Sequence, residues 1–266
     1  MEITFTPRTI TGGQYSIDTR TAGSVTLILQ TLLPIALHAD RACTYVIKGG
    51  TAVPFSPTVL YFQHIFCDRL GALVRLDVKR HGFYPAGGGE VTVNVQPADI
   101  TSMQLIERGD AHKIEVISIA STHLQNAHVA ERMLDGFKKI IPDARGAFEY
   151  VAANSPGCFV ASRACYVHGR IGADVLGKRG KRAEDVGKEV ARDLEREIAT
   201  GAPIDSWMVD QIIPYMALAV VQSDEPARIR IPDMTEHART NMWVVEKFLP
   251  VQFTVDKSIL QCNKKK

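Results

Sequence analysis

The sequence has no long apolar run and no strong excess of either charge. Lysine and arginine number 31 against 29 aspartate and glutamate residues, which gives a net charge of +2. This balance neither requires nor excludes a nucleic-acid partner, because a neutral protein can still form a basic groove. The longest apolar stretch, Val25–Ala39, is interrupted by Thr26, Gln30, Thr31, Pro34 and His38. It is too short and too polar to cross a bilayer, so we expect no membrane-spanning segment.

Cysteine is scarce, and its spacing forms no metal or disulfide pattern. The five cysteines are odd in number, and no two of them are separated by two residues. We therefore expect reduced thiols, and no cysteine zinc site. His123 and His128 are not four residues apart, so they do not form a metal-ligand pair on one helix face, and we predict no metal site. The first five residues show no basic and apolar leader, which predicts a cytoplasmic protein.

Apolar periodicity predicts a mixed α and β chain. The 266 residues are 45% hydrophobic and 23% charged, which excludes a disordered or collagen-like chain. Apolar residues spaced three and four apart predict helices, and alternating apolar residues predict strands. The expected helices are Ser24–Ala39, Val59–Leu70, Ala183–Thr200, Trp207–Val220 and Asn241–Phe248. The expected strands are Thr44–Ile47, Leu73–Lys79, Glu90–Gln96, Arg228–Ile231 and Val251–Val255.

The expected helices and strands form two similar series, one in each half of the chain. This repetition predicts an α+β fold made of a repeated unit, with helices on one face of each sheet. Between the runs, Lys113–Val167 has elements of its own: a strand, Ile114–Ile119, a helix, Ala127–Ile140, and a β pair, Phe148–Ala153 with Phe159–Val167. This predicts a small inserted α/β domain. The C-terminal Lys264–Lys266 is expected to be a frayed, solvated tail.

Small residues lead into the first predicted helix at Thr21–Ser24. Free backbone N–H groups at a helix N-terminus favour an anion such as phosphate. Ser24 is equally typical of a residue that only caps a helix. Gln30 is polar within an apolar run, and it either hydrogen-bonds a base or phosphate or faces solvent; periodicity does not decide between these alternatives.

The most distinctive segment is Arg80–Val91, which contains three successive glycines, Gly87–Gly89. Glycine runs lower the stability of an ordered backbone. Such a run therefore indicates that a ligand or another backbone segment approaches closely. The alternative is a wide hairpin turn between two strands.

Two further sites, His237 and Asp210-Gln211, carry side chains that could react with or bind a ligand. His237 lies between a predicted strand and a predicted helix, where loops often carry active-site groups. A neutral imidazole is a competent nucleophile, and Glu236 or Asp210 would fix its tautomer; the alternative is a surface or capping histidine. Asp210-Gln211 opens an apolar helix, where the aspartate either complements the helix dipole or, with Gln211, holds a ribose hydroxyl and a base edge.

Taken together, these segments resemble one family, the RNA 3′-terminal phosphate cyclases. The segment Arg80–Gly89 is very similar to that family's signature. Further matching motifs follow in the same order along most of the chain: Thr21–Ser24 with Leu29–Thr31, Lys48–Thr51, Gly177–Gly180, Asp210-Gln211 with Met216–Leu218, and His237 with Thr240-Asn241 and Glu246–Phe248.

The resemblance implies a ligase that uses ATP to convert an RNA 3′-phosphate end into a 2′,3′-cyclic phosphate. His237 matches the nucleophile, which would form a covalent bond with AMP and expel pyrophosphate. Mg²⁺ or another divalent cation would neutralise phosphate charge. Arg179 and neighbouring cations of Lys178–Arg182 either face RNA phosphates or lie in a solvated loop. The positions that match nucleotide-binding residues are Gln30, Trp207, Met208, Val209, Asp210 and Gln211.

The resemblance also implies repeated units, each a four-stranded sheet with two helices, and a smaller domain inserted in the last repeat. We expect the large domain to comprise residues 1–111 and 168–266 and the inserted domain to comprise residues 112–167. Family members begin with a repeat that contains a Gly-Glu-Gly-Gly-Gly-Gln stretch. None precedes Met1–Phe5, so we expect an incomplete first repeat and an exposed packing surface. Arg20 stands where the family usually has glycine.

Two other functions share this type of fold. A non-catalytic cyclase-like protein that binds RNA or assists ribosome assembly would lack the nucleophilic histidine, so His237 favours the enzyme, whereas the incomplete repeat favours the alternative. A transferase of the enolpyruvyl type shares the repeated architecture but needs no histidine bonded to a nucleotide.

Overall fold

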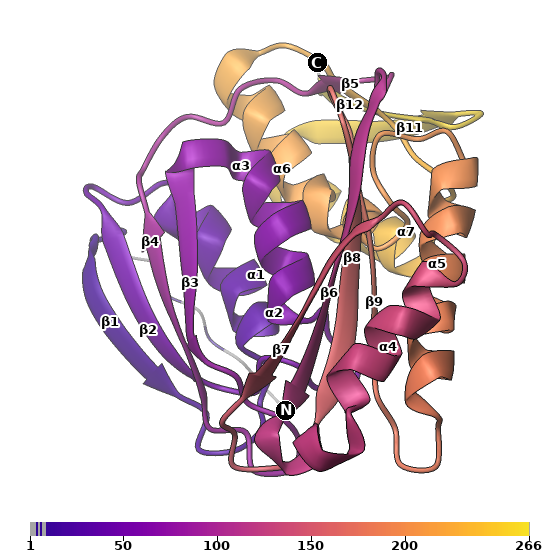
Figure 1. Cartoon of the computed structure of the whole chain (residues 1–266). Coiled ribbons are helices and arrows are strands. Elements are labelled where there is room, and N and C mark those ends of the chain that lie inside the picture. Colours follow the sequence, from indigo (N-terminus) through magenta and orange to yellow (C-terminus); the bar gives the residue numbers. More distant parts are fainter. Residues whose placement is uncertain (1–3, 5, 7–8, 266) are drawn as a thin grey trace.

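The computed structural model describes residues 4, 6 and 9–265, whose strands form three four-stranded sheets (Figure 1). The first sheet has the order β1-β2-β4-β3, with β1 parallel to β2 and the other neighbours antiparallel. Alternate residues of β2 and β4 are buried, so one face of this sheet packs against helices. Its strands are β1 (Gly13–Asp18), β2 (Cys43–Gly49), β3 (Val74–Arg80) and β4 (Gly89–Val95).

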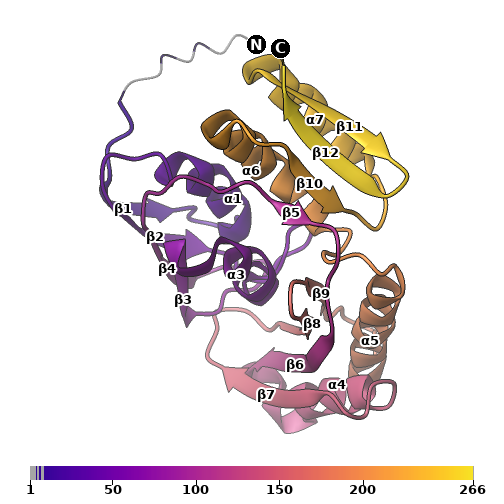
Figure 2. The same cartoon turned by 90° about the horizontal axis from the view of Figure 1, so that it is seen from above.

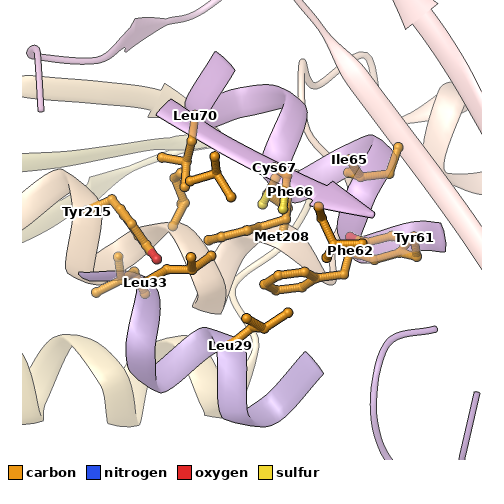
Figure 3. Close-up of a cluster of buried hydrophobic side chains, with 14 of the residues drawn as sticks. Leu29, Leu33, Tyr61, Phe62, Ile65, Phe66, Cys67, Leu70, Met208 and Tyr215 are labelled. Carbon is orange, nitrogen blue, oxygen red and sulfur yellow. The ribbon is translucent and has the colours of Figure 1, made fainter. Parts of the chain in front are cut away.

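Two helical runs belong to this first repeat. Helix α1 (Val25–Ala36) begins at Ser24, whose Oγ accepts a hydrogen bond from the backbone N–H of Leu27 at 3.4 Å. Leu29 and Leu33 of α1 meet apolar residues of the second run in a buried cluster (Figure 3). The second run comprises α2 (Val59–Tyr61), a π-helical segment η1 (Phe62–Cys67), α3 (Asp68–Leu70) and a 3-10 turn η2 (Gly71–Leu73).

The second repeat has the same connectivity as the first. Its sheet, read from its first strand, has the order β5-β10-β12-β11, which matches β1-β2-β4-β3 strand for strand. Here too the first two strands are parallel and the other neighbours antiparallel. The elements are β5 (Gln104–Leu105), α6 (Met208–Ser223), β10 (Ala227–Arg230), α7 (Glu236–Phe248), β11 (Val251–Asp256) and β12 (Ile259–Lys264). The predicted α+β fold with repeated sheet units is confirmed.

The inserted unit interrupts the second repeat between β5 and α6, and its sheet has the order β7-β6-β8-β9. Helices α4 and α5 pack so closely that a Cβ at Gly187 would lie 1.8 Å from the carbonyl oxygen of Met133, so this position requires glycine. The elements are β6 (Ala111–Ser121), η3 (Thr122–Ala127), α4 (Val129–Lys138), β7 (Arg145–Val151), β8 (Cys158–Tyr166), β9 (Arg170–Leu176) and α5 (Ala183–Ala199). The predicted boundary at residue 167 falls between β8 and β9 of this one sheet. We propose that the inserted unit occupies the whole stretch between β5 and α6.

One hydrophobic core extends through both repeats and into the inserted unit. Ile119, Phe159 and Ala161 of the inserted sheet belong to the same buried cluster as the apolar residues of α1 and α6. A second cluster lies between the inserted sheet and helices α4 and α5. Seen from above, α1 and α6 lie side by side between the sheets of the two repeats (Figure 2). No helix in the described part of the chain is long and apolar enough to cross a membrane.

The structure corrects three local predictions. Strands β7 and β8 do not pair with each other, because each lies on its own side of β6. Lys264 does not belong to a frayed tail; it ends β12 and forms an ion pair with Asp224 at 2.9 Å. Helix α7 begins at Glu236 and not at Asn241, because Thr235 Oγ1 accepts a hydrogen bond from the backbone N–H of Ala238 at 3.1 Å and caps the helix there.

Candidate active site

A cavity of about 370 Å³ lies where α1, α6 and α7 meet. It brings together Gln30 of α1 and both Asp210 and Gln211 of α6, three of the residues singled out from the sequence. Asn241 of α7 completes the polar part of the lining. The remaining lining residues are Leu27, Thr31, Phe66, Pro214 and Tyr215.

One hydrogen bond joins α7 to α6 at this cavity, and a second fixes the side chain of Gln211 on α6. The side chain of Asn241 donates from Nδ2 to the backbone carbonyl of Asp210 at 2.8 Å, which ties α7 to α6. The side chain of Gln211 donates from Nε2 to the carbonyl of Trp207, one turn earlier, also at 2.8 Å. Both amides are therefore fixed in orientation.

Two buried polar atoms of the lining have no hydrogen-bond partner among the described residues. They are Gln211 Oε1 and the hydroxyl oxygen of Tyr215. Figure 3 shows Tyr215 and Met208 of α6 extending into the apolar cluster formed by α1 and η1. Because nearly all buried polar atoms in proteins are hydrogen-bonded, the two unpaired atoms indicate a place where a ligand would supply the missing partners.

His237 lies on the first turn of α7, exposed to solvent, and not in a loop as the sequence predicted. Burial raises the pKa of Asp210 above its usual value, and the charge of a protonated His237 opposes that rise. Within the described residues no hydrogen bond joins the two side chains, and His237 does not line the cavity; it lies one helical turn before Asn241, which does. Of the two carboxylates considered from the sequence, Glu236 forms an ion pair with Arg239 at 3.4 Å. Asp210 is accordingly the better candidate to orient His237.

The stretch Trp207–Gln211 divides between the core and the cavity. Met208 and Val209 are fully buried in the hydrophobic core, and neither lines the cavity. Trp207 is 64% exposed and precedes α6. Asp210 and Gln211 face the cavity. The helical turn thus gives neighbouring residues of one sequence motif different surroundings.

The glycine-rich segment lies outside the cavity lining and joins three parts of the chain. A Cβ at Gly87, where φ is 64°, would lie 2.4 Å from the carbonyl oxygen of Thr21. The backbone N–H of Ala86 donates to Ser155 Oγ of the inserted unit at 3.1 Å. The glycines therefore permit close contact with the loop before α1 and with the inserted unit, which a free hairpin turn would not require.

The remaining candidates have simpler surroundings. Ser24 Oγ caps α1, as described above, and also contacts Thr26 Oγ1 at 2.9 Å. In the basic cluster, Lys181 pairs with Glu189. Lys178 and Arg179 are exposed and form no ion pair within the described residues.

Known proteins are similar to this chain over most of its length. A family profile described as RNA 3′-terminal phosphate cyclase matches residues 1–255. The chain belongs to the RNA 3′-terminal phosphate cyclase family. The match includes the first repeat, the inserted unit and the second repeat as far as residue 255, so every residue that lines the cavity between α1, α6 and α7 lies within it.

Proteins named RNA 3′-terminal phosphate cyclase are similar over nearly the whole chain. That of Methanosarcina barkeri is 37% identical over 262 residues, which cover 96% of this chain and 76% of the relative. That of Ignicoccus hospitalis is 37% identical over 265 residues, covering 94% of this chain and 73% of the relative. That of Archaeoglobus fulgidus is 36% identical over 267 residues, covering 98% and 78%.

Asn241 and Tyr215 are among the lining residues of this cyclase-family chain that were not assigned a role from the sequence. A signal existed for the first, because Asn241 follows His237 by four residues and such residues share one helix face. No local signal existed for Tyr215, which lies in an apolar helix and whose unpaired hydroxyl emerges only from its packing.

Proposed function

We propose that this chain uses ATP to convert an RNA 3′-phosphate end into a 2′,3′-cyclic phosphate, with His237 as the nucleophile. The observation that carries the proposal is the grouping of Gln30, Asp210 and Gln211 around one cavity, with His237 one helical turn before Asn241 of the same lining. Family membership supports the same reaction, because the relatives are named for it.

The reaction has three displacements at phosphorus. An imidazole nitrogen of His237 attacks the α-phosphorus of ATP; an N–P bond forms, and the P–O bond to pyrophosphate breaks. An oxygen of the RNA 3′-phosphate then attacks the same phosphorus, which breaks the N–P bond and transfers AMP to the RNA. Finally the neighbouring 2′-hydroxyl loses its proton, attacks the activated 3′-phosphorus, and releases AMP. The covalent step divides one difficult reaction into easier ones.

The residues at the cavity suit a nucleotide. Gln211 Oε1 can accept a hydrogen bond and the Tyr215 hydroxyl can donate one, and neither has a partner within the described residues. A neutral imidazole at His237 is held for attack if the Asp210 carboxylate accepts its other N–H. Within the described residues no group of three His, Cys, Asp or Glu side chains could hold a metal ion. We assign no residue to Mg²⁺ and expect it to enter with the phosphates of ATP.

The test is formation of a covalent protein–AMP adduct. Purified protein is incubated with ATP labelled at the α-phosphate and Mg²⁺, in parallel with His237→Ala. A matched control is His123→Ala, which changes another exposed histidine, in η3 of the inserted unit. We expect an acid-labile, alkali-stable label on the unaltered protein and on His123→Ala, and none on His237→Ala.

The outcomes separate the two functions. A label that persists in His237→Ala would refute the assigned nucleophile. Folded protein that binds ATP and RNA but acquires no label would favour the non-catalytic RNA-binding alternative. If the label forms, transfer to an RNA with a 3′-phosphate end, and its absence with a 3′-hydroxyl end, tests the remaining steps.

A further inference from the structure

The start of helix α6 is anchored by a fully buried carboxylate, Asp205. One oxygen, Oδ1, accepts hydrogen bonds from the hydroxyl of Tyr61 at 2.6 Å and from the backbone N–H of Met208 at 3.0 Å. The other, Oδ2, accepts from the backbone N–H of Gly172 at 2.8 Å. Asp205 thus joins α2 of the first repeat, β9 of the inserted unit and the first turn of α6.

A second carboxylate holds the adjacent residue. Glu197, near the end of α5 in the inserted unit, accepts at Oε2 from both the backbone N–H and the hydroxyl of Ser206, at 2.9 and 3.0 Å. In addition, the backbone N–H of Arg170 donates to the carbonyl of Pro203 at 3.0 Å. Pro203, Asp205 and Ser206, which lie just before α6, are therefore hydrogen-bonded to β9 and α5.

Within the described residues, the start of the equivalent helix of the first repeat is held by neutral groups. Helix α1 follows its own strand β1, is capped by the side chain of Ser24, and the backbone N–H of Val25 donates to the carbonyl of Gly50 at 3.0 Å. In the second repeat the inserted unit separates β5 from α6, so the local connection is lost. Asp205 adds contacts with the remote residues Tyr61 and Gly172, and Glu197 adds contacts from α5, the helix that precedes α6 in the chain.

Burial disfavours the charged form of Asp205. Burial raises the pKa of this carboxyl to about 7, and the hydrogen bonds from Tyr61, Gly172 and Met208 oppose that rise. Tyr61, Glu197, Asp174 and Arg69 are the charged or titratable groups that act on this cluster. A buried carboxylate is weak evidence of a contribution to stability. The hydrogen-bond geometry of Asp205 is therefore more informative than its burial.

We propose that Asp205 and Glu197 are positioning residues, through which the inserted unit fixes the stretch Trp207–Gln211 and so sets the affinity of the site for ATP. This inference rests on the proposed function of that site. It gives the inserted unit a role in nucleotide binding although none of its residues lines the cavity.

The test uses Glu197→Ala, with Glu195→Ala as the matched control on the same helix. Glu195 is exposed and makes no hydrogen bond or ion pair within the described residues. Amide hydrogen exchange reports whether the start of α6 is anchored, and the Kd for ATP reports whether anchoring matters. Glu197→Ala removes both hydrogen bonds to Ser206, so it should accelerate exchange at Ser206 and raise the Kd for ATP roughly ten-fold. Glu197→Gln, which keeps an acceptor oxygen, should restore most of both.

Asp205→Asn is the second variant, because the asparagine Nδ2 would face the N–H of Gly172 and disturb the same anchor. It should accelerate exchange at Gly172, whose N–H loses its acceptor, and raise the Kd for ATP in the same direction. Unchanged exchange at Ser206 and Gly172 would overturn the anchor, and faster exchange with an unchanged Kd would overturn the positioning role. Failure of the unaltered protein to bind ATP would instead refute the proposed function, before any variant is compared, and the positioning role with it.

Discussion

The side-chain amide of Gln211 is hydrogen-bonded through its nitrogen and not through its oxygen. Nε2 donates to the carbonyl of Trp207, whereas Oε1 is buried and unpaired within the part of the chain that the structure describes. An unpaired buried acceptor costs about 1–3 kcal/mol. The protein therefore keeps a group that lowers the stability of its free state, as is expected where a ligand completes the hydrogen bonding.

Arg20 is a second residue whose local geometry carries a cost. Its φ of 56° lies in the left-handed region, which disfavours residues with a side chain. Arg20→Gly should raise the free energy of unfolding by about 0.5–1 kcal/mol, because the relief of strain exceeds the extra freedom of the unfolded chain. Urea denaturation measures this change. Arg41→Gly, at an exposed arginine without positive φ, should lower stability instead; a lower midpoint for Arg20→Gly would contradict the prediction.

At the scale of elements, the second helical run differs from the uniform helix predicted over Val59–Leu70. Its middle, η1, is π-helical, and the rings of Phe62 and Phe66 stack there with centroids 4.8 Å apart. Phe66 also meets the ring of Tyr215 edge-on at 5.3 Å and lines the cavity. Wide turns of this kind often occur at functional sites. The side chain of Phe66 connects this turn to the candidate site.

Helix α7 makes limited contact with the core: Ala238 is its one fully buried residue within the described chain, and Met242 and Val245 are partly buried against the core. Thr235→Ala removes the capping bond to the N–H of Ala238 and should weaken the first turn by about 1 kcal/mol. We expect faster amide exchange over residues 236–240 and slower labelling of His237 by ATP. Ser24→Ala, which removes the cap of the well-buried α1, should lower global stability without exchange changes confined to α7. Unchanged exchange in Thr235→Ala would refute the dependence on the cap.

At the scale of the whole molecule, two helices that border the cavity present large apolar side chains to solvent. On α7, Trp243 is 62% and Phe248 is 83% exposed, and on α1, Leu27 and Ile35 are also exposed. Phe248 lies at helical spacing from His237 and Asn241, so it shares their face. An apolar surface beside a binding site is expected to contact a further segment or a partner.

His81 connects the glycine-rich segment with the inserted unit, because its ring lies 6.4 Å from that of Phe83 and 5.7 Å from that of Phe159. Burial lowers the pKa of His81 from 6.5 to about 4. Between these pH values the unfolded chain binds a proton that the folded protein does not. The stability contributed by the neutral ring is therefore present above pH 6.5 and is lost as the pH falls to 4, by about 3 kcal/mol.

The measurement is the free energy of unfolding of the unaltered protein and of His81→Gln between pH 4 and pH 7. The difference between the two proteins isolates His81 from other titrating groups, Asp205 among them. It should shift in favour of the variant as the pH falls. A difference that is independent of pH would show that the folded protein protonates His81 as readily as the unfolded chain.

The sequence by itself determined the order of most helices and strands and the family. Periodicity and capping act over a few residues, so the cap at Ser24 and the alternating burial of β2 and β4 followed from local pattern. The motifs named Gln30, Asp210, Gln211 and His237 as site candidates, and their roles remain predictions. Strands β1, β5, β9 and β12 were missed, and the start of α7 was placed five residues late.

Only the tertiary structure decided how remote residues meet. Asp205 bonds Tyr61 across 144 residues of chain, and no local pattern specifies such a pair. The same holds for the strand orders, for the place of the inserted unit between β5 and α6, and for the division of Trp207–Gln211 between core and cavity. The physical reason is that these contacts depend on how whole sheets and helices pack, whereas local pattern reports only which face of each element is apolar.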